Sequence, residues 1–405
     1  MRKRLLALVL ALGMSMCLSV PAQAIGTTAK AGEGQTASCG QNHTAVIKSD
    51  GTLWTWGGNN MGQLGNGTLQ DQVTPVEIMS DVAHVACGNL FTAAVKTDGT
   101  LWMWGSDILG QLGTGAGSAD WTFGDVRTDD TKSTPVQIMS NVSTVSCGQS
   151  FTMAIKTDGT LWGWGQTNDY QLGNNGAHDK RFSFSQFQSV PVKLMDNVTA
   201  VSCGGEHAAA IKTDGSLWIW GNNEDGQLGT GGREAAPTPI KVMEDVQTVS
   251  CGTAHTAAIK TDGSLWVWGY SCYTGNDSTE SKWQDVPTKV MDDVVAVSCG
   301  DYYTMAIKND GTLWAWGDNT FGQLGVGTGG DQVWLGQTLY TPMLVMEDVC
   351  AVSCGNGRFT AAVLFDGTLW MWGNNQNGQL EQSPGENRNI PALVADNVAL
   401  PKAFP

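Results

Sequence analysis

Lysine and arginine are scarce in this sequence. Its 405 residues include 22 of them against 38 aspartates and glutamates, so the formal net charge at pH 7 is -16. Proteins bind nucleic acids mainly through lysine and arginine on phosphates, and this deficit argues against a nucleic-acid partner. A negative charge of this size keeps a protein soluble and can steer a basic partner toward it, but it also fits a surface that is only solvated.

Histidine is also rare, and the motifs of common catalytic sites are missing. The histidines are His43, His84, His178, His207 and His255. They do not form the His-Glu-x-x-His spacing of zinc enzymes, and the sequence has no nucleophile elbow and no phosphate-binding loop. We therefore expect a protein that is not an enzyme, has no cofactor and binds no metal.

Long apolar runs are missing after the first 20 residues. Three positive charges within residues 1–4 precede an apolar run over residues 5–20, and small residues follow up to Ala24. This layout is typical of a signal peptide, and the run is shorter than the roughly 20 residues of a membrane-spanning helix. We predict a signal peptide at 1–24 and a mature protein at 25–405 that is secreted, extracellular or periplasmic, without a membrane span.

Cysteine marks a repeat that runs through most of the chain. Cys-Gly pairs recur at spacings of 48, 60, 56, 48, 48 and 55 residues, at Cys39, Cys87, Cys147, Cys203, Cys251, Cys299 and Cys354. An Asp-Gly follows each cysteine after eleven residues, or after twelve in the last repeat, and leads into Leu-Trp-x-Trp-Gly. Fourteen of the seventeen tryptophans belong to this pattern.

One repeat contains the signals of four short strands. A first strand ends at Cys251-Gly252, and a second covers Thr256 to Lys260. Asp262-Gly263 predicts a tight type I′ hairpin turn, which returns the chain into a third strand at Leu265 to Trp268. A segment that begins near a proline, such as Thr238 to Met243, suits an outer edge strand, because proline lacks an N–H.

These repeats predict a ring. Both faces of the third strand are mostly apolar, so each sheet must be covered by copies of itself, and units of about 50 residues with four strands fit a propeller. We predict an all-β fold, a single seven-bladed β-propeller of four-stranded antiparallel blades. The small residues before each Cys-Gly should lie innermost and the paired tryptophans should form core. Residues 396–398 repeat 196–198, so the C-terminal tail should begin a further inner strand beside residues 35–37.

The repeat resembles the RCC1 repeat. The resemblance rests on the run Cys-Gly-x-x-His-Thr-Ala-x-x-Lys-x-Asp-Gly-x-Leu-Trp-x-Trp-Gly, which is followed by Gly-Gln-Leu-Gly at Gly62 to Gly65 and at Gly226 to Gly229, and it covers roughly residues 35–398. With the signal peptide, it indicates a bacterial secreted type. The resemblance implies a binding scaffold whose turns on one propeller face carry partner contacts.

Two sets of residues are candidates for partner contact. The first is the ring of residues that precede the second strand, with their neighbours Leu90, Glu206, Tyr302 and Arg358; these side chains either bind a partner or pack against the neighbouring blade. The ring consists of His43, Phe91, Phe151, His207, His255, Tyr303 and Phe359. The second set is the tryptophans outside the repeat, Trp121, Trp283 and Trp334.

Insertions and the remaining cysteines complete the pattern. Repeats two, three and six are lengthened at 115–133, 174–189 and 327–341, which should place the insertions on one face, and repeat five replaces Gly-Gln-Leu-Gly by residues 270–275. The repeat cysteines are expected to stay free, because equivalent positions in neighbouring blades lie too far apart for a disulfide. Whether Cys272 and Cys350 pair stays open.

We therefore predict a secreted, non-catalytic, monomeric binding protein that uses one propeller face for a protein or other extracellular ligand. A surface glycan-binding or lytic-accessory protein is the alternative, based on the three tryptophans outside the repeat. Guanine-nucleotide exchange on a small GTPase, the activity of the eukaryotic protein that gives the family its name, ranks third, because export and acidity both oppose it.

Overall fold

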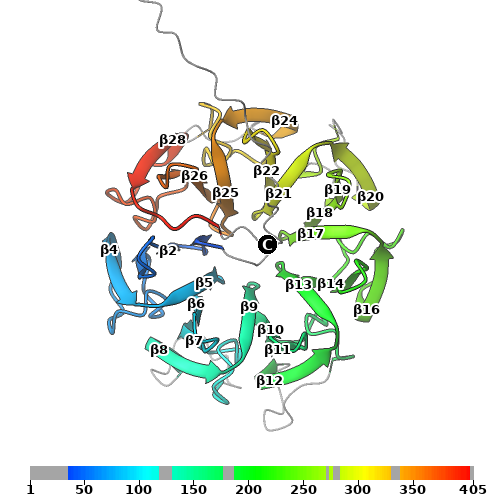
Figure 1. Cartoon of the computed structure of the whole chain (residues 1–405), viewed down its shortest axis with the longest axis horizontal. Helices are drawn as coiled ribbons and strands as arrows, with labels where there is room; N and C mark the ends of the chain where they lie inside the picture. The colour runs from blue at the N-terminus through cyan, green and yellow to red at the C-terminus, as the bar shows by residue number, and fades with distance from the viewer. Residues whose placement is uncertain are drawn as a thin grey trace, which may run out of the picture.

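The fold is a closed ring of seven sheets. The computed structural model describes residues 35–117, 130–176, 187–270, 273–276, 283–329 and 338–401. In these residues 28 strands form seven four-stranded antiparallel sheets around a common axis (Figure 1). This confirms the predicted seven-bladed β-propeller. The predicted signal peptide lies outside the described residues. Among the helices of the described residues, none has both the length and the apolar character needed to cross a membrane.

Each blade is a meander in which the order of strands in space follows their order in the chain. We number the blades 1 to 7 in chain order. The inner strands are β1 (Ala37–Cys39), β5 (Val82–Cys87), β9 (Val142–Cys147), β13 (Val198–Cys203), β17 (Val246–Cys251), β21 (Val294–Cys299) and β25 (Val349–Cys354). The second strands are β2 (His43–Ile47), β6 (Phe91–Lys96), β10 (Phe151–Lys156), β14 (His207–Lys212), β18 (His255–Lys260), β22 (Tyr303–Lys308) and β26 (Phe359–Leu364).

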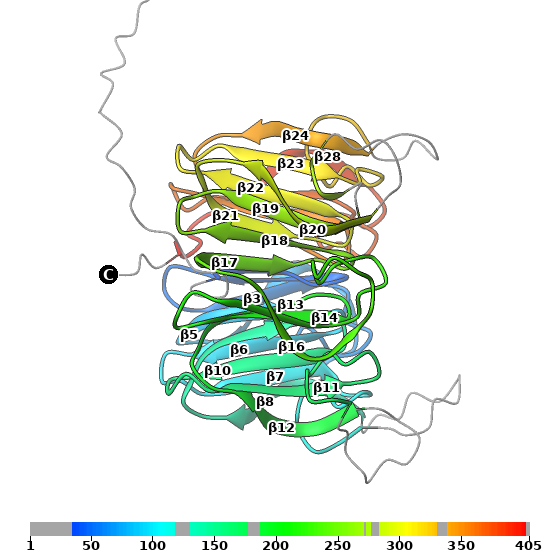
Figure 2. The same cartoon turned by 90° about the vertical axis from the view of Figure 1, so that its right-hand side faces the viewer.

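The third and fourth strands complete each blade toward the rim. The third strands are β3 (Leu53–Gly57), β7 (Leu101–Ser106), β11 (Leu161–Gln166), β15 (Leu217–Gly221), β19 (Leu265–Tyr270), β23 (Leu313–Gly317) and β27 (Leu369–Gly373). The outer strands are β4 (Gln72–Met79), β8 (Thr131–Met139), β12 (Phe187–Met195), β16 (Ala236–Met243), β20 (Trp283–Met291), β24 (Leu339–Met346) and β28 (Arg388–Ala395). Seen from the side, the strands run roughly along the ring axis, and the blades follow one another around it (Figure 2).

The Asp-Gly sequence forms the hairpin between the second and third strands, but with a different turn from the one predicted. Gly263 has a φ of 80°, whereas Asp262 is not among the residues with positive φ. The turn is therefore not of type I′, which needs a positive φ at both positions, and that prediction is wrong. Instead, the Asp262 carboxylate accepts hydrogen bonds from the backbone N–H and the hydroxyl of Ser264, at 2.9 and 2.6 Å. This capping fixes the turn without a left-handed aspartate.

The two tryptophans of each third strand have different roles. Trp268 is fully buried, and its indole N–H donates a 2.8 Å hydrogen bond to the carbonyl of Gln227 in the preceding blade. Trp266 is only half-buried, because it lies toward the hairpin end of the blade; its indole N–H donates to Ser264 at 2.9 Å, and the Lys260 ammonium lies over its ring. The prediction that both tryptophans are buried core is therefore wrong for the first of each pair.

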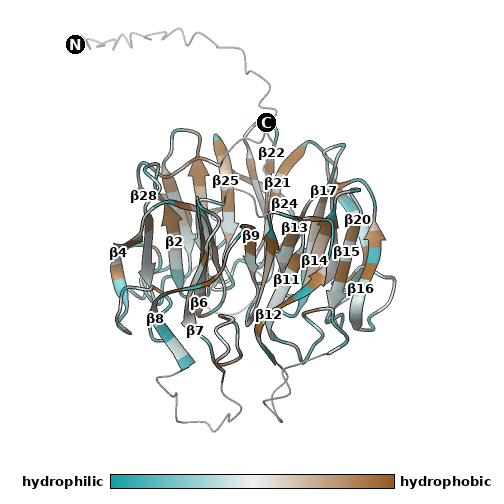
Figure 3. Cartoon of the chain, turned by 60° about the horizontal axis from the view of Figure 1, so that its bottom comes forward, coloured by the Kyte–Doolittle hydropathy of each residue, from teal (hydrophilic) through white to brown (hydrophobic). Residues whose placement is uncertain are grey.

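The second strand forms the centre of the packing between blades. Its first five residues are buried in every blade. Buried alanines allow neighbouring sheets to approach closely, and the core clusters combine residues of adjacent blades, such as Ala258 and Trp268 of blade 5 with Ile219 and Leu228 of blade 4. Figure 3 shows hydrophobic residues along the strands within the ring and hydrophilic residues at the connecting turns. Burial between blades therefore holds the ring together.

Both ends of the chain contribute to one strand, and this closes the ring. The N-terminal β1 pairs with β2, and Val398 from the C-terminal tail pairs with Lys48 of the same blade. The backbone N–H of Ser49 donates to the carbonyl of Asn397 at 2.8 Å, as the N–H of Thr97 donates to Asp81 between blades 1 and 2. This confirms the prediction that residues 396–398 begin a further inner strand beside the N-terminal segment.

Replacing Val398 by alanine is expected to lower the free energy of unfolding and to release the C-terminal tail. Val398 is buried, and a smaller side chain loses apolar burial at the only strand that joins the two chain ends in the described structure, at a cost of about 1–3 kcal/mol. Thermal unfolding and limited proteolysis of the C-terminus measure the two effects.

Val198→Ala is the matched control, because Val198 is the equivalent buried valine within blade 4. It should lower stability by a similar amount without exposing the C-terminus to protease. An unchanged melting temperature and unchanged proteolysis of the Val398→Ala protein would show that the ring closes without the tail.

Candidate binding face

Two kinds of connection between strands lie at one end of the propeller, which we call the loop face. It contains the turns between first and second strands and the loops between third and fourth strands. A backbone hydrogen bond joins them within a blade: the N–H of Asn222 donates to the carbonyl of Glu206 at 2.9 Å, and the N–H of Asp318 donates to that of Tyr302 at 2.8 Å. The Asp-Gly hairpins lie at the opposite end, the hairpin face.

The described flanks of the insertions lie on the loop face, as predicted, because all three insertions join a third strand to a fourth. The insertion residues 118–129, 177–186 and 330–337, with Trp121 and Trp334, lie outside the described residues. Phe187 at the end of the second insertion is buried, so this aromatic residue belongs to the core.

The predicted ring of residues before the second strand points between the blades. All seven side chains are at most 1% exposed, so they do not contact solvent. The Tyr303 hydroxyl, for example, donates a 2.6 Å hydrogen bond to the carbonyl of Phe359 in the next blade. Of the two interpretations left open by the sequence, the structure favours packing against the neighbouring blade. The ring residues are His43, Phe91, Phe151, His207, His255, Tyr303 and Phe359.

The three ring histidines each make the same hydrogen bond to the next blade. His43 Nε2 lies 2.8 Å from Thr92 Oγ1, and that hydroxyl donates to the carbonyl of Gln63 at 2.8 Å. The hydroxyl proton is therefore committed, so Nε2 must carry the donor proton and Nδ1 is left without a hydrogen-bond partner. Burial lowers the pKa of His43 to about 3, as it does for His207 and His255. These histidines are neutral structural links.

A cluster of three tyrosines lies on the loop face between blades 5 and 6. Tyr270 and Tyr273 are stacked with ring centroids 5.2 Å apart, and Tyr273 and Tyr302 have centroids 5.2 Å apart with tilted rings. All three are half-buried. We call Tyr270, Tyr273 and Tyr302 the tyrosine cluster. Centroid separations of this size are those of favourable aromatic pairs, so the rings support one another at the surface.

Comparison with the other blades shows that this cluster is a departure from the repeat. Tyr273 stands where other blades have the glutamine of Gly-Gln-Leu-Gly, and its carbonyl still accepts the indole N–H of Trp316 at 2.9 Å. The backbone role is thus kept while the side chain is replaced. The residues equivalent to Tyr270 are Gly58, Ser106, Gln166, Asn222, Asp318 and Asn374, and those equivalent to Tyr302 are Asn42, Leu90, Ser150, Glu206, Ala254 and Arg358.

Arg358 extends the tyrosine cluster into blade 7. Its Nε donates to Asp301 Oδ2 at 3.0 Å, and its Nη1 lies 3.5 Å from Asp318 Oδ2. The guanidinium also lies 5.2 Å from the Tyr302 ring centroid and 5.5 Å from that of Phe321. Burial raises the pKa of Asp301, although the Arg358 hydrogen bond opposes this effect. The arginine is therefore held in one orientation, with two carboxylates close to its charge.

Three carboxylates lie on the other side of the tyrosine cluster. Asp169 is in the loop after β11, Glu206 is in the turn before β14, and Glu224 is in the loop after β15. Burial raises the pKa of Glu206, and the charges of Asp169 and Glu224 raise it further. Burial likewise raises the pKa of Asp169, with a contribution from Glu224. The three carboxylates are close enough to repel one another, and we call them the acidic cluster.

Trp283 is the one member of the predicted tryptophan set within the described residues. It is 45% exposed at the start of β20, its indole N–H donates to Asp225 at 3.2 Å, and the Arg233 guanidinium lies 4.0 Å from its ring centroid. One face of the indole is thus covered by a cation. The stacking surface expected for a glycan is occupied there in part.

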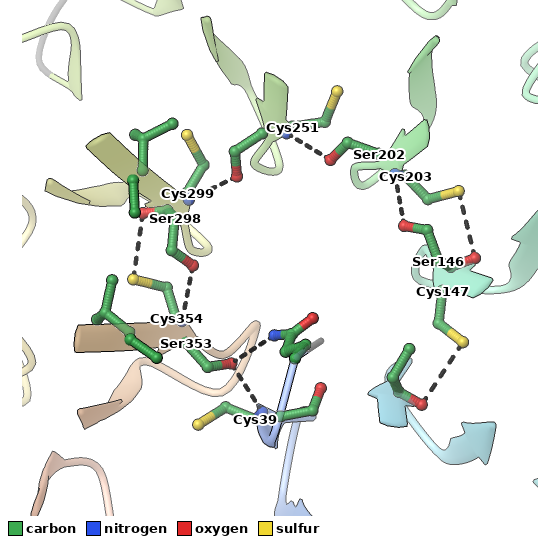
Figure 4. A pocket seen from close by; sticks show the side chains of 18 of the residues that line it. Cys39, Ser146, Cys147, Ser202, Cys203, Cys251, Ser298, Cys299, Ser353 and Cys354 are labelled. Atoms are coloured by element: carbon green, nitrogen blue, oxygen red, sulfur yellow. Dashed lines mark hydrogen bonds between the residues drawn. The ribbon is translucent and has the colours of Figure 1, made fainter. Parts of the chain in front are cut away.

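The ring axis holds a cavity of about 200 Å³ lined by the inner strands of all seven blades (Figure 4). At six of the seven blade junctions, a serine hydroxyl accepts the amide N–H of the next blade's repeat cysteine at 2.9–3.1 Å. The exception is the junction of blades 2 and 3, where Ala86 replaces the serine and the Cys147 thiol donates to the Ala86 carbonyl. The small residues therefore lie innermost, as predicted.

The repeat cysteines are structural. All seven are free, as is Cys350, and Cys272 lies outside the described residues. Burial raises the pKa of Cys87, Cys203 and Cys354 to about 12, which leaves the thiols protonated and unreactive. Within the described part of the chain, no group of three or more histidine, cysteine or acidic side chains is arranged to hold a metal ion.

Comparisons with known proteins agree with this geometry. The model of the RCC1-like domain matches residues 180–402, which is more than half of the chain, and that of the RCC1 repeat matches 50–95 and 98–155. The chain belongs to the family of RCC1-like domains. A second model of the RCC1 repeat matches this RCC1-like propeller at 36–63, 82–111 and 142–171.

Curated relatives match this RCC1-like propeller over limited stretches. The mitochondrial RCC1 domain-containing protein RUG3 of Arabidopsis thaliana is 36% identical over 91 residues, which are 22% of this chain and 19% of RUG3. The ultraviolet-B receptor UVR8 of the same plant is 29% identical over 207 residues, 48% of this chain and 43% of UVR8. The E3 ubiquitin-protein ligase HERC2 of Homo sapiens is 29% identical over 200 residues, 48% of this chain and 4% of HERC2. The chain spans less than half the length of each relative.

Solved structures share the fold. A chain in the crystal structure of Kap60 bound to yeast RCC1 (Prp20) has a TM-score of 0.71 at 18% identity, with 89% of this chain and 86% of that chain covered. Human WBSCR16 has a TM-score of 0.67 at 24% identity, with 79% and 83% covered. The family relationships suggest a binding or regulatory role.

The sequence predicted part of this site. Tyr302 and Arg358 were among the predicted contact residues and lie at the surface of the loop face. For Tyr270 and Tyr273, the sequence showed only that repeat five departs from Gly-Gln-Leu-Gly. For Asp301 and Asp318, nothing except their charge indicated a role in the site. The missing information is which positions of neighbouring blades meet across a junction.

Proposed function

We propose that this chain is an exported, non-catalytic propeller that holds a protein partner on its loop face, with the tyrosine cluster at the centre of the contact. One observation carries the proposal: blades 5 and 6 place tyrosines at loop-face positions where the other blades have no aromatic side chain. Tyrosine and arginine are enriched at the energetic centres of protein interfaces. The family relationship to binding and regulatory propellers supports the same role.

Preorganisation supports this assignment. The tyrosine rings contact one another, and Arg358 is fixed by Asp301, Asp318 and the Tyr302 ring. Side chains that are already ordered lose little conformational entropy when a partner binds. The central cavity, with a volume of about 200 Å³ and a lining of serine, cysteine and valine, lies below the size range of small-molecule pockets. A surface contact is thus the better-supported mode of binding.

Site-specific photocrosslinking tests the proposal. A benzophenone amino acid at Tyr302, or at the exposed Glu224 of the same face, should produce a discrete adduct with one protein when the full chain is expressed in its producing organism. Asn309 is the matched control, because it lies exposed on the hairpin face of the same blade as Tyr302. Absence of an adduct at both loop-face positions, or identical adducts at Asn309, would contradict the proposal.

Export has its own test. The prediction of a signal peptide at 1–24 implies that the protein outside the cytoplasm begins at residue 25. Mass spectrometry of the culture fluid and periplasm should find this N-terminus. A full-length protein that stays in the cytoplasm would remove export from the proposal and leave the loop-face contact untouched.

A further inference from the structure

Negative charge is compensated differently on the two faces of the propeller. The carboxylates of the described loop-face turns and loops are Asp71, Asp107, Asp130, Asp169, Glu206, Glu224, Asp225, Glu234, Asp301, Asp318, Glu381 and Glu386. The cations of the same described segments are Arg233 and Arg358. Carboxylates also occupy the turns of the hairpin face, but lysines lie beside them, and ion pairs join Lys96 to Asp81, Lys193 to Asp196, Lys241 to Glu244 and Lys289 to Asp292. The described part of the loop face therefore carries negative charge that fewer cations compensate.

Both of these arginines are already engaged. Arg358 pairs with Asp301 and Asp318, and the Arg233 guanidinium lies over the Trp283 ring. The acidic cluster has no such compensation: among the described residues, no lysine or arginine forms an ion pair with Asp169, Glu206 or Glu224. Burial raises the pKa of Glu206 and of Asp169, and the repulsion between these carboxylates raises it further. An approaching cation would relieve that repulsion.

The acidic cluster and the tyrosine cluster lie on consecutive parts of the ring. Asp169 is in blade 3, Glu206 and Glu224 are in blade 4, and the tyrosines are in blades 5 and 6. Asp225, the residue after Glu224 in blade 4, contributes to the raised pKa of Tyr302, for which burial is the main cause. A ligand that contacts both clusters must extend over several blades, which favours a polypeptide segment over a small cation.

We infer that the partner presents an extended basic segment to this face, with lysine or arginine side chains beside Asp169, Glu206 and Glu224 and over the rings of the tyrosine cluster. This inference rests on the proposed loop-face contact and adds the chemistry of the partner. Carboxylates attract the cations over long distances, and tyrosine faces attract them at contact. Complementary charge of this kind mainly sets association rate and partner choice.

Binding of synthetic peptides to the full mature chain tests the inference. The probes are a short fluorescent peptide of alternating lysine and serine and a counterpart with glutamate in place of lysine, measured by fluorescence anisotropy. The lysine peptide should bind, and its affinity should fall as salt is raised from about 0.01 to 0.15 M, because the Debye length shortens from about 30 to about 8 Å. The glutamate peptide should not bind.

Variants locate the contact on the protein. The double substitution Glu206→Gln with Glu224→Gln should weaken the lysine peptide roughly two- to thirtyfold, as expected for two surface charge pairs. Tyr302→Leu should weaken it further, whereas Tyr302→Phe should not, because phenylalanine keeps the aromatic face. Glu77→Gln is the matched charge control, since Glu77 is exposed on the outer strand of blade 1, and it should have no effect.

The outcomes separate this inference from the proposed function. Equal binding of both peptides, or full affinity of the Glu206→Gln, Glu224→Gln protein, overturns the basic-segment inference. The same holds if the segment crosslinked at Tyr302 or Glu224 is acidic, although the loop-face contact then stands. Absence of any loop-face adduct removes the proposed function and this inference together.

Discussion

Replacing Trp268 by alanine is expected to lower the free energy of unfolding by about 3–5 kcal/mol, far more than the same change at Trp266. Trp268 is fully buried between blades 4 and 5, and its indole N–H is hydrogen-bonded to the Gln227 carbonyl. Truncation leaves a cavity and a buried carbonyl with one partner fewer. Trp266 is half-buried and bonded only within its own hairpin, so its loss should cost less.

Urea unfolding followed by circular dichroism measures this difference. Trp266→Ala is the matched control for Trp268→Ala, since the two residues lie in one strand on the same side of the sheet and differ in how deeply they are buried. Trp268→Phe should fall between the wild type and Trp268→Ala, because it keeps most of the apolar burial and loses the hydrogen bond. Equal destabilisation by the two alanine variants would contradict the assignment of separate roles to the paired tryptophans.

Acidification from pH 7 toward pH 4 is expected to destabilise the protein by several kcal/mol through three buried histidines. The pKa of His43, His207 and His255 is about 3 in the folded protein, against 6.5 for an ordinary histidine. Below pH 6.5 the unfolded chain binds protons that the folded chain cannot, so stability falls as pH falls until about pH 3. Each histidine contributes a slope of up to about 1.4 kcal/mol per pH unit.

The repeat itself supplies the variant that tests this slope. Phenylalanine occupies the histidine position in blades 2, 3 and 7. Next to the phenylalanine of blade 2, Thr152 of blade 3 still donates to the Gln111 carbonyl at 2.8 Å. The triple variant His43→Phe, His207→Phe, His255→Phe should therefore fold and show a flatter decline in stability between pH 6.5 and 4. Parallel pH profiles of variant and wild type would show that the histidines do not titrate as proposed.

Other titrating groups act in separable ways. Burial raises the pKa of Asp107 to about 6, so protonation of this carboxyl favours the folded state as pH falls from about 6 toward 4. The hairpin aspartates, such as Asp50 and Asp98, have a lowered pKa because Thr52 and Thr100 donate hydrogen bonds to them, and their contribution is lost below about pH 4. Both effects are common to wild type and triple variant, so the difference between the two profiles isolates the histidines.

The sequence was sufficient to predict the fold, because each repeat contains recognisable signals for its strands and turns. Cys-Gly, Asp-Gly and Leu-Trp-x-Trp-Gly define three strands in every copy, and the similarity of residues 396–398 to residues 196–198 predicted the closure of the ring. Because the strand pattern recurs seven times, it also predicted the architecture of the whole ring. Such information is absent from a chain whose elements occur only once.

The sequence was insufficient for side-chain direction at the blade junctions. His43 and Asn42 are adjacent, yet His43 points between blades and the Asn42 position faces the loop side, and only the angle between neighbouring sheets decides which of the two meets solvent. For the same reason, the meeting of Tyr273 with Tyr302 across a junction was not visible. How deeply each tryptophan of a pair is buried, which distinguishes Trp266 from Trp268, is likewise determined by the packing of neighbouring sheets.

The shared inner strand of blade 1 has a consequence for how the protein is made. Ile47, Lys48 and Ser49 emerge early in synthesis, but their backbone partners at residues 397–399 emerge only after the other blades. The first blade must wait, with an unpaired edge, while the remaining blades are synthesised and fold in turn. If the chain crosses a membrane during export, this waiting period coincides with its passage. Chaperone binding to the N-terminal blades should therefore end when residues 397–399 are released, and a chain truncated before Val398 should stay bound.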